Sequence, residues 1–283
     1  MPENNRGEPR VETISTADVM PESAGGDVSG AMLAGATISP AGAVTGAVVA
    51  DLDLPYTVAS CGMSLDGYLS GPGEERLLLS NDADFDRVDE VRAGCDAILV
   101  GASTVRRDDP RLVIRSPQRR AARVARGLAP SPVKVTMTVT AELDPCANFF
   151  TQGQSEKIVY CAPSTVDDLR ARLDGLATVV AVEPLPSGRV DPRLVAVDLA
   201  TRGVRRLMVE GGGTVHTQFL TAGLVDELHL VVAPFFVGDS RARRFVGDGC
   251  FPWHAQRRAT LAEVRQIGDV VLLRYALSER FDG

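Results

Sequence analysis

Short apolar runs separated by amphipathic segments make up most of this chain of 283 residues, and their alternation leaves few folds open to it. Apolar runs of a few residues are typical of buried strands, and amphipathic segments are typical of helices. The expected strands cover 56–61, 97–100, 133–139, 157–161, 178–182, 205–210 and 227–233. The expected helices cover 82–93, a segment opening at 164, 191–203 and a segment ending at 222. Strands that alternate with helices predict an α/β protein with a mostly parallel sheet and helices on both faces.

The end of the sequence departs from this alternation. Two longer strands are expected at 260–266 and 270–277, and the dipeptide Gly268-Asp269 between them is typical of a tight hairpin. An antiparallel hairpin therefore closes a mixed sheet. We find no internal repeat and no second domain, so residues 51–283 are expected to form one domain.

The first fifty residues have a different composition. Acidic residues outnumber arginines in 1–27, and 28–50 carry no charge but are rich in Ala, Gly, Ser and Thr. A secretory segment would begin with basic residues, so we interpret 1–50 as a disordered tail. An added strand or helix that docks on the core is the alternative.

Composition argues against several classes of partner. A net charge of −7 gives no overall field for nucleic acid or an anionic membrane. The basic run from Arg115 to Arg126 has no interleaved aromatic residue, so we interpret it as a solvated loop or helix face. Five scattered cysteines predict buried, reduced thiols and a cytoplasmic protein. Three scattered histidines predict no metal site.

The stretch 101–115 places polar groups at the end of an expected strand. Gly101, Ser103 and Thr104 follow the apolar run, Asp108 comes next, and Pro110 prevents a helix from continuing. This order predicts a crevice lined by hydroxyls and carboxylates, with Arg115 turning back toward it. An ordinary passage from strand to solvated loop is the alternative.

A second stretch, 207–214, ends a strand on three consecutive glycines before a helix. Such a turn lets backbone approach an anionic group, and the helix amino terminus supplies N–H donors, as a dinucleotide pyrophosphate requires. The sequence matches neither the G-x-G-x-x-G pattern nor a P-loop, since no lysine follows. A tight turn without a ligand is the alternative. A third stretch, Ser64 to Gly67, indicates only a turn.

Taken in order, these blocks resemble a known family. The chain carries S-L-D-G, then D-A-I-L-V-G-A-S-T-V-x-x-D-D-P-x-L-x-x-R, then R-x-L-M-V-E-G-G-G-T, then D-E-L-H-L-x-x-A-P-x-x-x-G. This arrangement, over 55–277, resembles the reductase domain of riboflavin biosynthesis. The resemblance implies a dihydrofolate-reductase-like α/β fold.

The resemblance also implies an activity. Such an enzyme uses NADPH to reduce the ribosyl group of a ribosylaminopyrimidine 5′-phosphate to ribityl, with hydride passing from nicotinamide C4 to sugar C1′ held as a Schiff base. A homodimer is implied. Residues that fall at the family's cofactor positions are Gly62, Thr104, Asp108, Gly212, Gly213 and Thr214. Residues at its substrate positions are Arg92, Leu112, Arg115 and Glu210.

The residues themselves suggest compatible roles. Arg92 and Arg115 can bind a phosphate as guanidinium forks. Glu210 can accept hydrogen bonds from the pyrimidine or the ribose, and it is our candidate catalytic group. A solvated charge on a helix is the alternative for Arg92.

Three departures from the family separate this chain from bifunctional bacterial members. Leu77-Leu78-Leu79 replaces a Trp-Ile-Thr-like segment, and Ser60 replaces a lysine. The zinc deaminase signature is missing, so the chain is similar to stand-alone reductases, and either a separate deaminase acts or the substrate is not deaminated. The alternatives are a reductase of another pteridine or pyrimidine and a non-catalytic nucleotide-binding protein.

Overall fold

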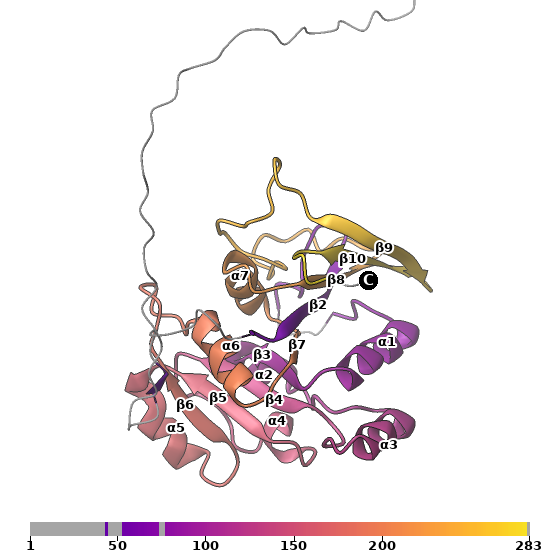
Figure 1. The fold of residues 1–283 in the computed structure, drawn as a ribbon. Coiled ribbons are helices and arrows are strands. Elements are labelled where there is room, and N and C mark those ends of the chain that lie inside the picture. The colour runs from indigo at the N-terminus through magenta and orange to yellow at the C-terminus, as the bar shows by residue number, and fades with distance from the viewer. Residues whose placement is uncertain (1–42, 45–52, 74–76, 282–283) are drawn as a thin grey trace, which may run out of the picture. The chain divides into compact units, whose positions relative to one another are not determined.

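The predicted alternation of strands and helices is present in the computed structural model, which describes residues 43–44, 53–73 and 77–281 (Figure 1). The strands are β1 (Ala43–Val44), β2 (Tyr56–Ser64), β3 (Ala97–Gly101), β4 (Val133–Thr138), β5 (Lys157–Cys161), β6 (Thr178–Val182), β7 (Arg206–Val209), β8 (Glu227–Ala233), β9 (Thr260–Ile267) and β10 (Val270–Ala276). Within the described ranges these strands form one sheet, in the order β1-β6-β5-β4-β3-β7-β2-β8-β10-β9.

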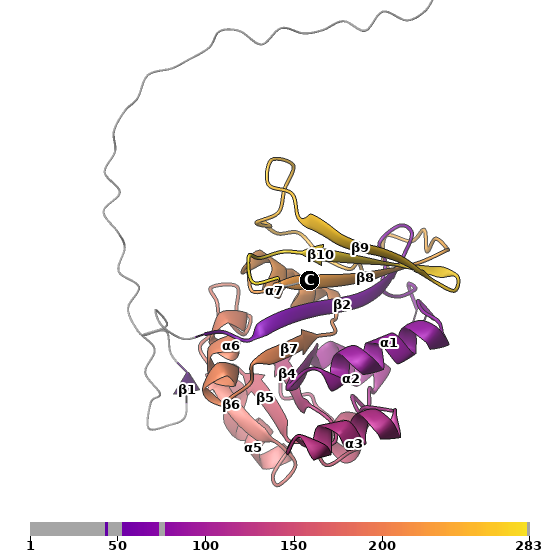
Figure 2. The same ribbon diagram turned by 45° about the vertical axis from the view of Figure 1, so that its right-hand side comes forward.

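The sheet is mixed, as expected. Every pair from β1 to β8 is parallel, whereas β10 runs antiparallel to both β8 and β9. Figure 2 shows this hairpin lying beside β8, which separates it from β2. Gly268 turns the hairpin with φ of +63°, a conformation that favours glycine. The strand β2 therefore lies between β7 and β8, which come much later in the chain.

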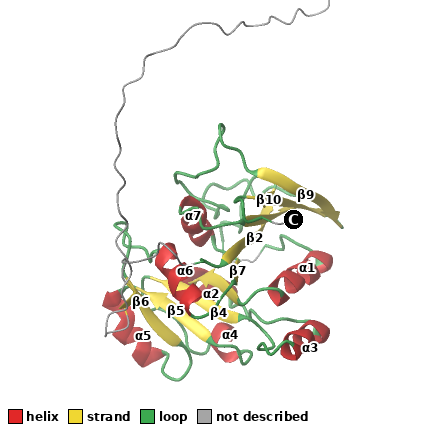
Figure 3. Ribbon diagram, viewed as in Figure 1, coloured by secondary structure: helices red, strands yellow, loops and turns green. Residues whose placement is uncertain are grey.

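Helices cover both faces of the sheet (Figure 3). They are α1 (Asp82–Ala93), α2 (Ala102–Asp108), α3 (Pro117–Ala125), α4 (Asn148–Thr151), α5 (Val166–Arg172), α6 (Pro192–Thr201) and α7 (Gly213–Thr221). Alternate residues of β3 divide the core between the two faces: Leu99 packs with residues of α6 and α7, and Ile98 packs with residues of α1, α2, α4 and α5. Both faces of the sheet are thus buried at its centre.

Several local predictions are confirmed, and two are wrong. Asp191 caps α6 through the backbone N–H of Arg193, and Gly203 ends the helix region with φ of +85°. The capping box expected at Ser164 does not form, because a 3₁₀ turn at Pro163–Thr165 precedes α5. The segment after β3, for which no helix was predicted, folds into α2 before Pro110.

The basic run is not simply solvated. Arg123 on α3 is only 4% exposed, and its guanidinium donates to the backbone carbonyls of Ala93, Cys95 and Ala129. Carbonyl oxygens near the end of α1 thereby satisfy a buried cation, which explains why a charge pattern alone did not reveal it. Arg119 pairs with Asp86 and Asp89 of α1.

The cysteine prediction is partly wrong. Cys95 and Cys161 are buried, and all five thiols are free, but Cys146 and Cys250 are exposed and Cys61 is intermediate. Exposure follows from their positions: both exposed cysteines lie in connecting segments rather than in strands.

Most of the expected tail lies outside the described residues. Within it, Ala43 and Val44 pair in parallel with Ala181 and Val182 of β6. No helix in the described part of the chain combines the length and apolar character needed to cross a membrane.

Candidate functional site

A cavity of about 650 Å³ opens where the carboxyl ends of β2, β3 and β7 meet. The helix α1 forms one wall and the glycine turn before α7 forms another. Parallel strands bring their carboxyl ends to one edge of the sheet, so polar residues that follow them converge there. The predicted site residues that line the cavity are Gly62, Arg92, Thr104, Asp108, Arg115, Glu210, Gly212 and Gly213.

The end of β3 contributes hydroxyls and one of two adjacent carboxylates. Thr104 on α2 and Asp108 at the end of that helix line the cavity. The neighbouring Asp109 points elsewhere: it has φ of +41°, and its carboxylate accepts from the backbone and side-chain N–H groups of Asn148 at 2.6 Å each. Two adjacent aspartates thus have separate tasks, one at the cavity and one at the start of α4.

The glycine turn approaches the strand ends closely. A Cβ placed on Gly212 would lie 3.2 Å from Oγ1 of Thr104, and one placed on Gly101 would lie 2.9 Å from Val215. A Cβ on Gly213 would overlap the backbone carbonyl oxygen of Arg244. Gly213 therefore needs glycine for space, and Gly101 and Gly212 are tightly packed positions. The turn presents backbone to the cavity at the amino terminus of α7.

Arg92 and Glu210 form a two-pronged ion pair across the cavity. The Nε and Nη2 atoms of Arg92 donate to the two carboxylate oxygens of Glu210 at 2.6 and 2.5 Å. The side chains are only 19% and 13% exposed. Burial opposes the charged guanidinium, but the carboxylate beside it outweighs this effect and raises the pKa of Arg92.

The remaining predicted residues occupy three different environments. Arg115 lines the cavity, and its guanidinium lies 5.5 Å from the ring centre of Phe85 on α1. Leu112 is 2% exposed and packs in the core under α2, with φ of +46°. Thr214 is exposed in the first turn of α7. Neither Leu112 nor Thr214 is among the residues that line the cavity.

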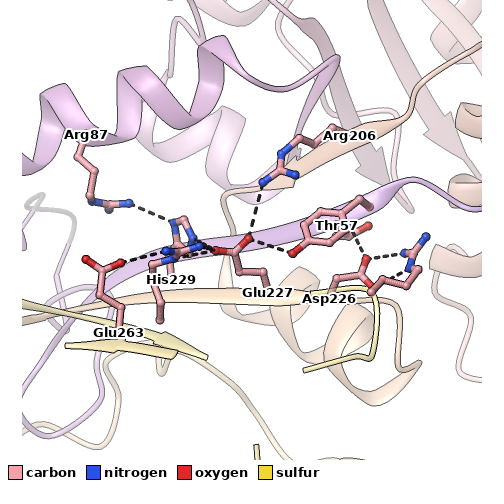
Figure 4. A network of polar contacts seen from close by, with 10 residues as sticks. Thr57, Arg87, Arg206, Asp226, Glu227, His229 and Glu263 are labelled. Carbon is pink, nitrogen blue, oxygen red and sulfur yellow. Dashed lines mark hydrogen bonds and ion pairs between the residues drawn. The ribbon is translucent and has the colours of Figure 1, made fainter. Parts of the chain in front are cut away.

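Sequence reasoning missed a buried polar network under α1, shown in Figure 4. Arg87 lines the cavity, donates from Nε to Asp84 at 2.6 Å, and places Nη1 3.2 Å from Nδ1 of His229. Nε2 of His229 in turn lies 2.6 Å from Glu227. The three-residue spacing of Asp84 and Arg87, which puts both on one face of a helix, is the sequence signal that could have indicated their ion pair.

Sequence reasoning also missed His216, the buried histidine of α7. It is fully buried and lines the cavity beneath the glycine turn, and among the described residues neither ring nitrogen has a hydrogen-bond partner. Burial lowers its pKa to about 4, so the ring is neutral at physiological pH. Its ring lies 5.5 Å from that of Phe245.

Two further arginines lie at the outer part of the cavity, near Asp108. Arg107 and Arg243 both line it. Partial burial and the nearby charge of Arg107 lower the pKa of Arg243. Two guanidinium groups that repel one another beside a glycine turn form a surface suited to an anionic group.

The departures from the family noted in the sequence lie on the cavity wall. Ser60, Leu77, Leu78 and Leu79 all line it. A Cβ on Gly62 would lie 3.1 Å from the Cβ of Leu79, so this strand and this segment are in close contact. In the described part of the chain no cluster of three histidine, cysteine or acidic side chains is arranged to hold a metal ion.

Comparison with known proteins now identifies the family. The model of the RibD C-terminal domain matches residues 55–273. The chain belongs to this family. The 2,5-diamino-6-ribosylamino-4(3H)-pyrimidinone 5′-phosphate reductase of Methanothermobacter thermautotrophicus is 33% identical over 231 residues, covering 79% of this chain and 98% of that protein. The enzyme of the same name from Archaeoglobus fulgidus is 30% identical over 228 residues, covering 81% and 99%.

Solved structures confirm the expected RibD-like, dihydrofolate-reductase-like fold. RibD of Acinetobacter baumannii superposes with a TM-score of 0.63 at 24% identity, over 79% of this chain and 58% of that one. This chain therefore spans little more than half of that protein. The reductase Rib7 of Saccharomyces cerevisiae superposes with a TM-score of 0.59 at 17% identity, over 82% and 93%.

Proposed function

We propose that this chain is an NADPH-dependent reductase that converts the ribosyl group of a ribosylaminopyrimidine 5′-phosphate to ribityl. The observation that carries the proposal is the convergence of Thr104, Gly212 and the Arg92–Glu210 pair on one cavity, in a chain of the RibD C-terminal domain family. The named archaeal reductases, which match over nearly their whole length, support the assignment.

The residues present fit a dinucleotide cofactor. Gly212 and Gly213 line the cavity at the amino terminus of α7, where backbone N–H groups can meet a pyrophosphate. Gly62, Thr104 and Asp108, which line the cavity, would surround the rest of the cofactor, and Arg107 and Arg243 would hold its additional phosphate. Thr214 lies outside the cavity and would contact only a part of the cofactor that extends beyond it. A reduced nicotinamide supplies hydride at such a site.

The opposite side of the cavity fits the sugar phosphate. Arg115, whose side chain reaches the opening, would bind the 5′-phosphate. Arg92 uses Nε and Nη2 to hold Glu210, which leaves its Nη1 edge for the same phosphate. Glu210 would accept hydrogen bonds from the ribose hydroxyls and thereby orient the reacting carbon. We assign it this orienting role, because Arg92 holds both of its carboxylate oxygens in place.

Apolar side chains would exclude water from the reaction. Leu77 and Leu79 come from the segment before α1, Val88 from α1 and Val231 from β8, and all line the cavity. Leu112 would contribute indirectly, by supporting α2 from the core. Exclusion of water and orientation are the two contributions that hydride transfer needs from the protein.

The substrate we favour is the diamino pyrimidinone named for the archaeal relatives. A stand-alone reductase that accepts the diamino form needs no prior deamination. A separate deaminase, a homodimeric assembly, a cytoplasmic location and a reductase domain spanning 51–283 behind a disordered tail remain predictions.

The test is a comparison of two substrates. Purified protein is incubated with NADPH and either the diamino pyrimidine phosphate or its deaminated counterpart, and the absorbance of reduced cofactor is followed. We expect oxidation of NADPH, faster with the diamino form. Failure to oxidise NADPH with both compounds would overturn the proposal.

A second candidate, reduction of another pteridine or pyrimidine, is favoured by Ser60 and Leu77 on the cavity wall. Efficient turnover of dihydrofolate, with no turnover of either pyrimidine phosphate, would support it. A non-catalytic nucleotide-binding protein would instead be stabilised by NADPH in a thermal-shift assay without turning over any of these compounds.

A further inference from the structure

An unpaired hydrogen-bond donor lies at the α1 wall of the cavity. Arg87 lines this cavity, yet its side chain is only 9% exposed. Its Nη2 atom is buried and has no hydrogen-bond partner among residues 43–44, 53–73 and 77–281. A buried charged donor without an acceptor is costly, so a natural site of this kind calls for an explanation such as a ligand.

The other guanidinium atoms of Arg87 are fixed in place. Nε donates to Asp84 at 2.6 Å, and Asp84 also accepts from the hydroxyl of Ser80. Nη1 lies 3.2 Å from Nδ1 of His229. A guanidinium is planar, so two fixed edges determine the direction of the third.

His229 is in the form needed to accept from Arg87. Its Nε2 lies 2.6 Å from the carboxylate of Glu227, which can only accept a hydrogen bond. Nε2 therefore carries the ring hydrogen, and Nδ1 carries the lone pair that accepts from Arg87. Burial, together with the charges of Arg87 and Arg274, lowers the pKa of His229 despite the presence of Glu227. The ring is therefore neutral at physiological pH and directs Arg87 without repelling it.

Glu227 is itself held from several sides. Arg274 donates to it at 2.5 and 2.8 Å, and the hydroxyl of Tyr56 donates at 3.1 Å. Burial would raise the pKa of Glu227, but the hydrogen bonds from His229 and Arg274 lower it to about 2. The carboxylate is charged at every physiological pH, and it is linked through His229 to Arg87 (Figure 4).

The chemistry around Nη2 selects its acceptor. A phosphate is disfavoured because the carboxylate of Asp84 lies against the same guanidinium and lines the same cavity. A neutral carbonyl oxygen next to an N–H group suits the pair, since the oxygen accepts from Arg87 while the N–H donates to Asp84. The ring edge of a pyrimidinone has this arrangement, with a carbonyl beside a ring N–H.

We propose that Arg87 is a specificity-determining residue that donates from Nη2 to the ring carbonyl oxygen of the pyrimidine, while Asp84 accepts from the adjacent ring N–H. His229 and Glu227 act as positioning residues for this contact. The inference rests on the proposed function and assigns the residues that recognise the ring, which sequence comparison left open.

The first experiment compares Arg87→Met, Arg87→Lys and the control Arg241→Met, whose exposed arginine pairs with Asp239 outside the cavity. For Arg87→Met we expect KM for the pyrimidine phosphate to rise roughly 10- to 100-fold, the range for a lost hydrogen bond to a charged group. The affinity for NADPH should change less than twofold. Arg87→Lys should recover part of the loss, and Arg241→Met should match the unsubstituted protein.

The second experiment needs no folded variant. An analogue of the pyrimidine phosphate that lacks the ring carbonyl should bind the unsubstituted protein roughly 10- to 100-fold more weakly than the parent compound. Where Arg87→Met folds, the analogue and the parent should bind it equally, a result that a purely structural role would not produce.

The outcomes separate this inference from the function on which it rests. If the unsubstituted protein reduces neither pyrimidine, the proposed function fails and this inference fails with it. If it reduces one of them, but the analogue binds as tightly as the parent, or KM is unchanged in Arg87→Met, only the role of Arg87 is overturned.

Discussion

The two ends of the cavity present different kinds of groups: buried, hydrogen-bonded side chains at α1, and backbone with exposed side chains at the glycine turn. At the α1 end, Arg87 and His229 are buried side chains whose bonds fix their directions before any ligand arrives. At the glycine-turn end, Gly212 and Gly213 offer backbone, while Asp108 and Arg243 beside them are exposed. We infer that the α1 end recognises the pyrimidine ring through hydrogen bonds of fixed direction. At the other end, the glycine turn lets backbone N–H groups come close to the phosphates of the cofactor.

The difference has an energetic basis. The desolvation penalty of burying an ion pair is about as large as the electrostatic attraction between its two charges. The geometry that such a pair imposes therefore explains its presence better than any gain in stability. A glycine turn imposes no side-chain geometry, but it lets N–H donors come within hydrogen-bonding distance of an anion. We therefore infer that fixed side-chain pairs select the ring at the α1 end, whereas exposed backbone N–H groups in the glycine turn bind phosphate.

The largest effect we expect comes from placing a methyl group in the glycine turn. In Gly213→Ala the Cβ would overlap the carbonyl of Arg244, so the turn must move. NADPH affinity should fall at least about 100-fold, and the free energy of unfolding should drop by roughly 3 kcal/mol, the upper end for overpacking. Cofactor titration and urea unfolding measure both. Gly94→Ala, whose Cβ has only an ordinary contact at 3.5 Å, is the control and should change neither.

Next in size is the loss of the ion pair that joins the two ends. Glu210→Gln leaves Arg92 partly buried without a counter-charge, and we expect the free energy of unfolding to fall by about 3 kcal/mol, the lower end for a broken buried pair. Asp86→Asn, which breaks a pair whose aspartate is 67% exposed, should cost less than about 1 kcal/mol. If urea unfolding shows equal losses of unfolding free energy for Glu210→Gln and Asp86→Asn, the Arg92–Glu210 pair is not shielded from solvent.

A smaller effect distinguishes the two buried histidines. His229 has two partners and His216 has none. Because the pKa of His216 falls from 6.5 to about 4 on folding, the unfolded chain binds its proton first as pH drops. Stability is therefore lost as pH falls from 6.5 toward 4, by roughly 2 kcal/mol between pH 7 and pH 5.

Urea unfolding at these two pH values checks this prediction. His216→Leu should remove this part of the pH dependence, because no titrating ring remains at that position. His254→Leu, which replaces an exposed histidine, should leave the pH dependence as it is. A pH dependence that is identical in all three proteins would contradict a buried neutral ring at His216.

The smallest effect tests whether the exposed arginines serve the cofactor alone. Arg243→Ala should raise KM for NADPH about tenfold, near 1.4 kcal/mol, and change KM for the pyrimidine less than twofold. Arg241→Ala removes an arginine that pairs with Asp239 outside the cavity, and steady-state kinetics should show no change. A rise in KM for the pyrimidine in Arg243→Ala would contradict the assignment of one end of the cavity to the cofactor and the other to the pyrimidine.

Strand and helix periodicity made most of the fold predictable. The hairpin at Gly268, the cap at Asp191 and the run from Glu227 to Ala233 all lie where the pattern placed them. The helix α2 was not predicted, because its seven residues present too little periodicity before Pro110.

The site was predictable only where backbone chemistry or the family resemblance marked it. Glycines and hydroxyls at strand ends pointed to the crevice, and Thr104 and Gly212 do meet there. Arg87 and His229 were missed because their contact joins residues that are 142 positions apart. No local pattern distinguishes such a pair from two unrelated polar residues.

The position of β2 in the sheet has a consequence for biosynthesis. Its residue Thr57 bonds to Asp226, 169 positions later, so the strand has no neighbours until most of the chain has been made. At translation rates of about 5–20 residues per second, this apolar strand waits on the order of 10 to 30 s for its partners. The nascent chain should therefore depend on chaperones during that interval, and its completed domain should refold slowly for its size.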